Sequence, residues 1–171
     1  MRFGAREPAL PGDVLARAGL ERGERPLARA ETRDGSWLLG TRARLVVVGP
    51  EAVVSLPWEQ VEAADWDRDD ERLRITEVGE FGRARSSYTF TVAEPRLLLQ
   101  LVRERVTHSV VLQRRVTVRD RQGFSVIARR NPAGGPLRWM HEYDRGVDPA
   151  DPQVARLAED ALREARAEVG E

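Results

Sequence analysis

Acid–base chemistry is suggested by three successive residues, His141, Glu142 and Tyr143. A histidine or a carboxylate acts as a general acid or base when it lies in a cleft with a shifted pKa. The surrounding pattern is that of a strand, in which alternate side chains point to opposite faces. His141 and Tyr143 therefore share one face and Glu142 the other. We expect a structural role for His141, and an enzyme of unknown class stays a third alternative.

Metal ligands are sparse. The chain has two histidines and no cysteine, which excludes thiolate metal sites, cysteine nucleophiles and disulfides. Residues 65 to 69 are similar to the start of a calcium-binding loop, but Asp70 and Thr76 stand where that loop needs glycine and glutamate. We therefore expect a solvated hairpin tip at this position, no cofactor and no metal, and a protein that is not an enzyme.

Arginine is the other residue type with informative chemistry, because all 28 basic residues are arginine. Its planar guanidinium binds phosphate and carboxylate groups in a bidentate manner. Several arginines lie after residue 108, with Phe124 and Trp139 among them. This combination is seen in nucleic-acid binders. The candidate surface for an anionic ligand (nucleic acid or a lipid headgroup) or for a partner comprises Arg115, Arg119, Arg121, Arg129, Arg130 and Arg138.

Strand alternation favours a different role for these arginines. It puts Arg129 and Arg138 on the same kind of face as Glu142, where cross-strand ion pairs would neutralise them. It also puts Arg114 in the apolar register of its strand. Because an unpaired buried charge is costly, we expect a carboxylate beside Arg114 if that side chain points inward.

Charge is unevenly distributed, although the formal net charge is zero. Residues 50 to 80 hold ten acidic residues against three arginines, a balance of −7, and residues 107 to 147 hold eight arginines against three acidic residues, a balance of +5. Such asymmetry concerns partners rather than the fold. The composition is that of a globular protein, and no segment has the apolar run of a secretory signal or a membrane helix. We expect a cytoplasmic protein without a transmembrane segment.

Short strands separated by turn residues dominate the chain after a tail with a short helix at residues 1 to 24. Aromatic residues are expected to anchor the core: Trp37, Trp58, Trp66, Tyr88, Phe90 and Trp139. Gly and Pro punctuate the strands, and proline opens each of two amphipathic helices. Strands are expected at 27–32, 37–41, 44–48, 53–57, 62–66, 72–78, 88–92, 110–118, 124–130 and 137–143, and helices at 95–106 and 152–170.

Two stretches carry a resemblance to a known superfamily. Residues 40 to 47, Gly-Thr-Arg-Ala-Arg-Leu-Val-Val, resemble the strand-turn-strand signature of bacterial PH-like and GRAM-like domains. Residues 56 to 61, Leu-Pro-Trp-Glu-Gln-Val, resemble the next landmark of the same domains. The resemblance covers about residues 25 to 108. The chain as a whole is also similar to an actinobacterial protein family, a resemblance that implies no activity.

The resemblance implies an α+β, mainly antiparallel fold: a PH-like meander or barrel of about seven strands capped by a helix. A second three-stranded antiparallel meander and a C-terminal helix, residues 109 to 171, would extend it, packed on the first part as one globular unit. Lipid-binding members use basic residues in the first hairpin loop, where this chain has a single arginine, Arg33, beside Asp34. This difference argues against phosphoinositide binding at that loop. We therefore expect a non-enzymatic protein-interaction or scaffold module, with self-association possible. Binding of an anionic ligand through the second meander is the alternative.

Overall fold

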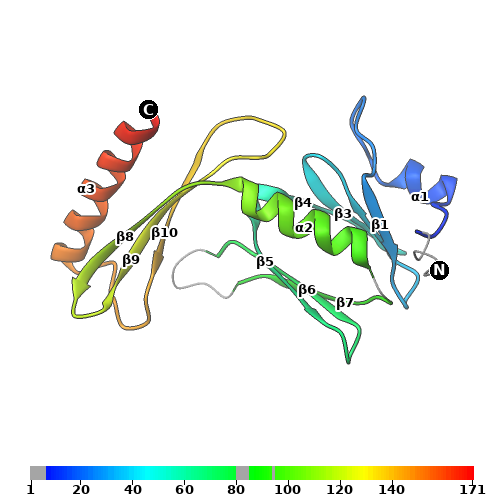
Figure 1. Ribbon diagram of the computed structural model, residues 1–171, viewed down its shortest axis with the longest axis horizontal. Coiled ribbons are helices and arrows are strands. Elements are labelled where there is room, and N and C mark those ends of the chain that lie inside the picture. The colour runs from blue at the N-terminus through cyan, green and yellow to red at the C-terminus, as the bar shows by residue number, and fades with distance from the viewer. Residues whose placement is uncertain (1–6, 80–84, 94) are drawn as a thin grey trace, which may run out of the picture.

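Residues 7–79, 85–93 and 95–171 are described by the computed structural model, which is α+β with mostly antiparallel strands (Figure 1). In this part of the chain the strands form three sheets accompanied by three α-helices. The first sheet has the order β1-β2-β3-β4, with strands at Ala28–Glu31, Trp37–Gly40, Arg44–Val48 and Val53–Pro57. The second has the order β5-β6-β7, with strands at Val61–Asp67, Arg72–Glu77 and Ser87–Thr91.

A third sheet and a long helix make up the C-terminal part. Its order is β10-β9-β8, with β8 at Val110–Arg119, β9 at Gln122–Arg129 and β10 at Arg138–Tyr143. Helix α3 (Pro152–Val169) lies against one face of this sheet (Figure 1). Asp151 caps α3 by accepting the backbone N–H of Gln153 at 2.7 Å, and Gly170 ends it with a φ of 82°.

Strand β3 is covered on both faces, as its nearly continuous β-branched run predicts. Leu45 and Val47 belong to the main core under helix α2 (Arg96–Ser109), and Val46 and Val48 face helix α1 (Gly12–Arg17). Gly40 allows α2 to approach the sheet, because a Cβ at this position would lie 2.6 Å from the Leu101 side chain. The N-terminal part is thus a layered β structure with a helix on each side.

The C-terminal sheet has a core of its own. Phe124 and Val126 of β9 pack against Val154, Ala158 and other small residues of α3, apart from the main core. Small side chains on the helix let it approach the sheet closely, which is how an 18-residue helix with few large residues is held there. The molecule therefore has separate hydrophobic cores on the two sides of a junction between α2 and β8.

The expected strands and helices are present with small shifts at their ends, but the described sheets do not close into a barrel. Pro57 gives the reason at one place. It ends β4 without an N–H to donate, and the 3₁₀ turn η1 (Trp58–Gln60) then redirects the chain into a different sheet. Among the strands described, β4 and β5 are therefore not neighbours in one ladder.

The expected aromatic anchors are core or core-edge residues. Trp58 is fully buried and donates its Nε1–H to the Thr41 carbonyl at 3.1 Å, and Trp37 is buried against α1. Half-buried aromatic residues complete the set: Trp66, Tyr88 and Phe90 at the margin of the main core, and Trp139 beside α3. None of the described helices is long and apolar enough to cross a membrane.

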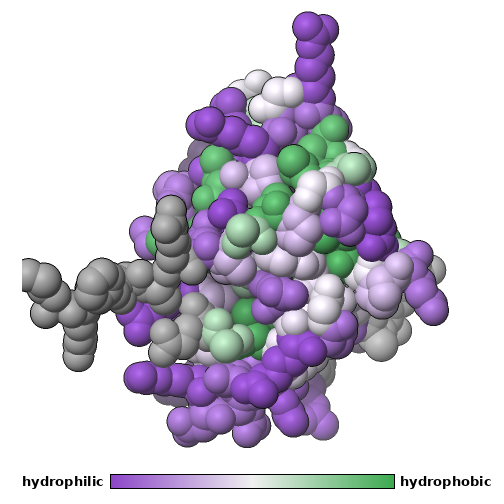
Figure 2. Space-filling view, turned by 90° about the vertical axis from the view of Figure 1, so that its right-hand side faces the viewer, coloured by the Kyte–Doolittle hydropathy of each residue, from purple (hydrophilic) through white to green (hydrophobic). Residues whose placement is uncertain are grey.

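The end of the molecule that carries α1 does not present one continuous apolar surface. Figure 2 shows this side, with hydrophobic side chains in separate groups among hydrophilic ones. Leu15 and Val53 are exposed to 44% and 41%. Scattered apolar residues of this kind are normal on a protein surface and do not mark a binding site.

Candidate functional site

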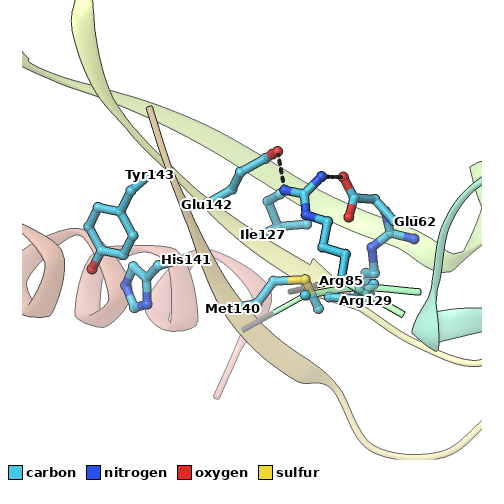
Figure 3. A pocket seen from close by; sticks show the side chains of 10 residues that line it. Glu62, Arg85, Ile127, Arg129, Met140, His141, Glu142 and Tyr143 are labelled. Atoms are coloured by element: carbon cyan, nitrogen blue, oxygen red, sulfur yellow. Dashed lines mark hydrogen bonds and ion pairs between the residues drawn. The ribbon is translucent and has the colours of Figure 1, made fainter. Parts of the chain in front are cut away.

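The junction between the two cores is held by polar contacts from both sides. Arg85, just before β7, donates to Glu62 of β5 at 2.6 Å and to Glu142 of β10 at 3.5 Å. Figure 3 shows its guanidinium between the two carboxylates. Burial raises the pKa of the Glu62 carboxyl, whereas the neighbouring Arg85 charge acts in the opposite direction. Asn131 adds a second connection, donating to the Ala43 carbonyl at 2.8 Å.

Arg129 lies inside this junction rather than on a surface. Arg129 is only 6% exposed. Its Nη1 donates to the Val61 carbonyl at 2.8 Å and to Ser109 Oγ at 3.0 Å. Its Nε is buried without a hydrogen-bond partner among the residues that the structure describes. Burial lowers the pKa of Arg129. Arg129 therefore orients β9 against β5 and is not part of an exposed basic surface.

Two adjacent hollows run along β10. One, of about 90 Å³, is lined by Glu62, Arg85, Arg129 and the end of β10, and the other, of about 390 Å³, by Glu59, Glu77 and the start of β10. They share Val78, Gly79 and Met140. Every residue of β10 lines one hollow or the other: Arg138, Trp139 and Met140 the second, and Met140, His141, Glu142 and Tyr143 the first. We call these two hollows together the β10 trough.

The possible acid–base group is divided by the strand. His141 and Tyr143 point towards α3, with ring centroids 5.9 Å apart, and His141 Nε2 lies 3.4 Å from the Ala158 carbonyl oxygen. Glu142 points to the other face, towards Arg85 (Figure 3). Burial raises the pKa of the Tyr143 hydroxyl above its ordinary value. The three side chains line one hollow but do not converge on a common point.

The arginines expected to form one surface lie at two ends of the third sheet. Arg119 and Arg121 are at the β8–β9 turn, whereas Arg130 and Arg138 are at the opposite end of β9. The seven residue steps from Gln122 to Arg129 separate the ends by about 23 Å at ~3.3 Å per residue. Arg115 is already paired, since Nη1 donates to Asp144 Oδ1 at 2.9 Å and this bond lowers the pKa of Asp144.

The expectation of cross-strand pairing with Glu142 was wrong. Arg129 bonds to the backbone and to Ser109, Glu142 pairs with Arg85, and Arg138 has no ion pair with any described residue. Arg85 was the missing partner. It lies in a loop where no periodicity predicts its direction, so the sequence carried no signal for it.

Arg114 has two carboxylates beside it, where one was expected. Arg114 lies on the face covered by α3, and its Nη1 and Nη2 donate to Glu164 at 2.7 Å and to Glu168 at 3.0 Å. The apolar register of β8 and the cost of an unpaired charge were sufficient to predict this contact. Glu164 and Glu168 are four residues apart, so they lie on the same side of the helix.

No cluster of three or more metal-ligating side chains occurs in the described ranges. Comparison of the chain with protein-family models, with curated proteins and with solved structures found no match.

Proposed function

We propose that this protein is a non-enzymatic protein-binding module that holds an extended segment of a partner along the outer edge of β10. In this proposal a PH-like domain of about residues 25 to 108 forms one wall of the binding site. The extension of residues 109 to 171 supplies the strand that pairs with the partner. Extended segments bind in this way because the backbone groups of an edge strand are available for hydrogen bonds.

The observation that carries the proposal is the β10 trough. β10 is the last strand of its sheet, and its only pairing among the described strands is with β9. Hollows of about 90 and 390 Å³ follow all of its six residues. The smaller hollow is also lined by Ile127 and Arg129 of β9 and so lies over the face of the sheet, whereas the larger is lined by β10 and by no residue of β9. The larger hollow is therefore the one beside the side of β10 where an added strand would lie, at a spacing of about 4.8 Å.

The side chains along β10 offer different chemistry on its two faces. Arg138, Met140 and Glu142 face the junction, so a partner segment would meet a cation, a flexible apolar side chain and an anion in succession. Trp139, His141 and Tyr143 form the other face beside α3. Met is an adaptable contact at binding surfaces, and aromatic side chains are frequent anchors in them.

The PH-like part of the proposal is supported by the order of elements and by one turn. Strands β1 to β7 precede α2, as in the plan that the resemblance implies. Thr41 fixes the turn between β2 and β3, since its Oγ1 accepts the Arg44 N–H at 3.1 Å and the Ala43 N–H at 3.2 Å. A threonine before this turn thus has a structural reason.

A library of short random peptides displayed on phage, selected on the full chain, tests the proposal. Hydrogen exchange of the complex with a selected peptide should slow at the amides of β10. Met140→Asp, which places a charge in the floor of the trough, should weaken the affinity of that peptide by about tenfold or more.

Val111→Asp is the matched control. Val111 is 45% exposed and lies on β8, at the opposite edge of the same sheet, so this variant should keep the affinity. Far-ultraviolet circular dichroism and thermal unfolding establish that both variants fold. The proposal is refuted if selected peptides bind Met140→Asp as well as the original chain, or if the amides that become protected lie outside β10.

A further inference from the structure

We infer that the partner segment held by β10 is β10 of a second copy of this chain, so that two molecules form one continuous six-stranded sheet. This inference rests on the proposed function and names the partner for the same edge. The two strands would run antiparallel about a two-fold axis through Met140. Closed two-fold pairing of this kind buries the same surface on both subunits.

The sequence of β10 is self-complementary in that register. Arg138 of one copy lies opposite Glu142 of the other, and Glu142 of the first lies opposite Arg138 of the second. Trp139 and His141 are paired on the α3 face, and Met140 meets Met140 on the axis. Directly opposed residues of antiparallel strands share a face, so each charge meets its opposite on the junction face.

A shift of register removes this complementarity. Moving the axis to His141 places Met140 opposite Glu142, and moving it to Trp139 places Arg138 opposite Met140. A shift that puts the axis between two residues would bring together side chains from opposite faces. Charge pairing therefore selects the register centred on Met140.

Other edge strands of the described sheets lack this combination. The outer edge of β1 is occupied, since the Arg29 N–H donates to Glu7 at 3.0 Å. β4 and β7 carry no charged residue, and β5 carries only acidic ones, so none of the three can form such pairs with itself. β8 carries only positive charge, which repels a second copy. β10 has both signs, with Arg138 and Glu142 each two residues from Met140.

The charges of β10 are available for a second copy. Arg138 is exposed and has no ion pair among the described residues, and Glu142 is exposed with one contact to Arg85 at 3.5 Å. A carboxylate accepts several hydrogen bonds, so Glu142 can keep Arg85 and accept a second guanidinium. Strand alternation predicted that Arg138 pairs with Glu142 of the same chain. In the inferred dimer, Glu142 is paired with Arg138 of the other copy instead.

A charge-exchange experiment on the full chain tests the inference. Sedimentation equilibrium of the unchanged protein should give a dimer. Arg138→Glu and Glu142→Arg should each weaken the dimer by about tenfold or more, because each variant creates two like-charge contacts across the axis. The double variant with both substitutions restores both pairs and should recover the dimer.

Arg130→Glu is the matched control, since Arg130 is exposed and lies just beyond β9, outside the pairing strand. It should leave the dimer unchanged. A monomer at the highest accessible concentration, or a dimer insensitive to both single variants, overturns the inference. Failure of recovery in a folded double variant also overturns the proposed register.

The two proposals fail in different ways. If the chain is monomeric while selected peptides protect the β10 amides, β10 binds other proteins and the self-pairing is wrong. If the chain is a dimer through β10, the selected peptides should dissociate it, because peptide and second copy use the same edge. A charge-sensitive dimer that coexists with bound peptide overturns the common site.

Discussion

The pairing of Glu24 with Arg44 predicts a defined loss of stability at low pH. Arg44 Nη2 donates to Glu24 Oε2 at 2.7 Å, and Thr41 Oγ1 donates to Glu24 Oε1 at 2.7 Å. The Arg44 side chain is 19% exposed and the Glu24 side chain 9% exposed. The Arg44 hydrogen bond, with smaller contributions from Glu21 and Thr41, lowers the pKa of Glu24 from 4.5 to about 2.

The size of the effect follows from that pKa. A shift from 4.5 to about 2 corresponds to an upper limit of about 3.5 kcal/mol at ~1.4 kcal/mol per unit. The folded pKa lies below the unfolded one, so this stabilisation is present at neutral pH and is lost as the pH falls from about 5 to about 2. Glu24→Gln should lower the free energy of unfolding by about 2 kcal/mol at pH 7, because the amide keeps one hydrogen bond.

Urea unfolding followed by tryptophan fluorescence measures the effect in the relevant part of the molecule. Trp37, Trp58 and Trp66 all lie in the N-terminal part, with Glu24. The difference between the unchanged chain and Glu24→Gln should shrink steadily as the pH is lowered. Glu31→Gln on β1 is the control, since Glu31 is exposed and has no ion pair with a described residue. Parallel pH profiles for the original chain and Glu24→Gln would refute the reasoning.

Two further substitutions test the C-terminal part by chemical denaturation. Gly123→Ala should lower the free energy of unfolding by about 3 kcal/mol or more, since its Cβ would lie 1.9 Å from the Val116 carbonyl oxygen. Gly12→Ala is the control and should be almost neutral, because a Cβ there would have no atom within 4 Å. Equal losses for the two variants would contradict the close approach at Gly123. Arg114→Gln should cost at most about 1 kcal/mol, because the Arg114 side chain is 35% exposed, and the loss should decrease at high salt. A loss independent of salt would mean that packing rather than charge is involved.

Local pattern predicted the elements well because their signals are local. Pro95 and Pro152 open helices, Gly49-Pro50 ends a strand, and the alternation of Val110 to Val118 gives the observed face that packs on α3. The Arg114 contact was also predictable, because the register of β8 and the cost of a buried charge both pointed to an acidic neighbour. These predictions needed only the chain's own periodicity.

Placement between elements was not predictable in the same way. Strand parity correctly gave Arg129 and Arg138 the face of Glu142, but parity does not tell which element covers that face. The element that covers this face is β5, so Arg129 is buried and donates to the Val61 carbonyl. Glu142 is contacted by Arg85, which lies in a loop without periodicity. The prediction of a possible barrel was wrong for a similar reason. Pro57 and η1 separate β4 from β5 into two sheets, and local sequence patterns do not show how two sheets are placed.

The polar character of the junction explains why a trough remains beside β10. Apolar side chains fill space by interdigitation, as they do on the α3 face around Phe124. The contacts of the junction are instead hydrogen bonds with fixed geometry: Arg129 to Val61, Asn131 to Ala43 and Arg85 to two carboxylates. Such contacts set the orientation of the two parts without filling the space between them. The edge of β10 is therefore left beside a hollow with both charge signs available, which are the conditions that pairing with another strand requires.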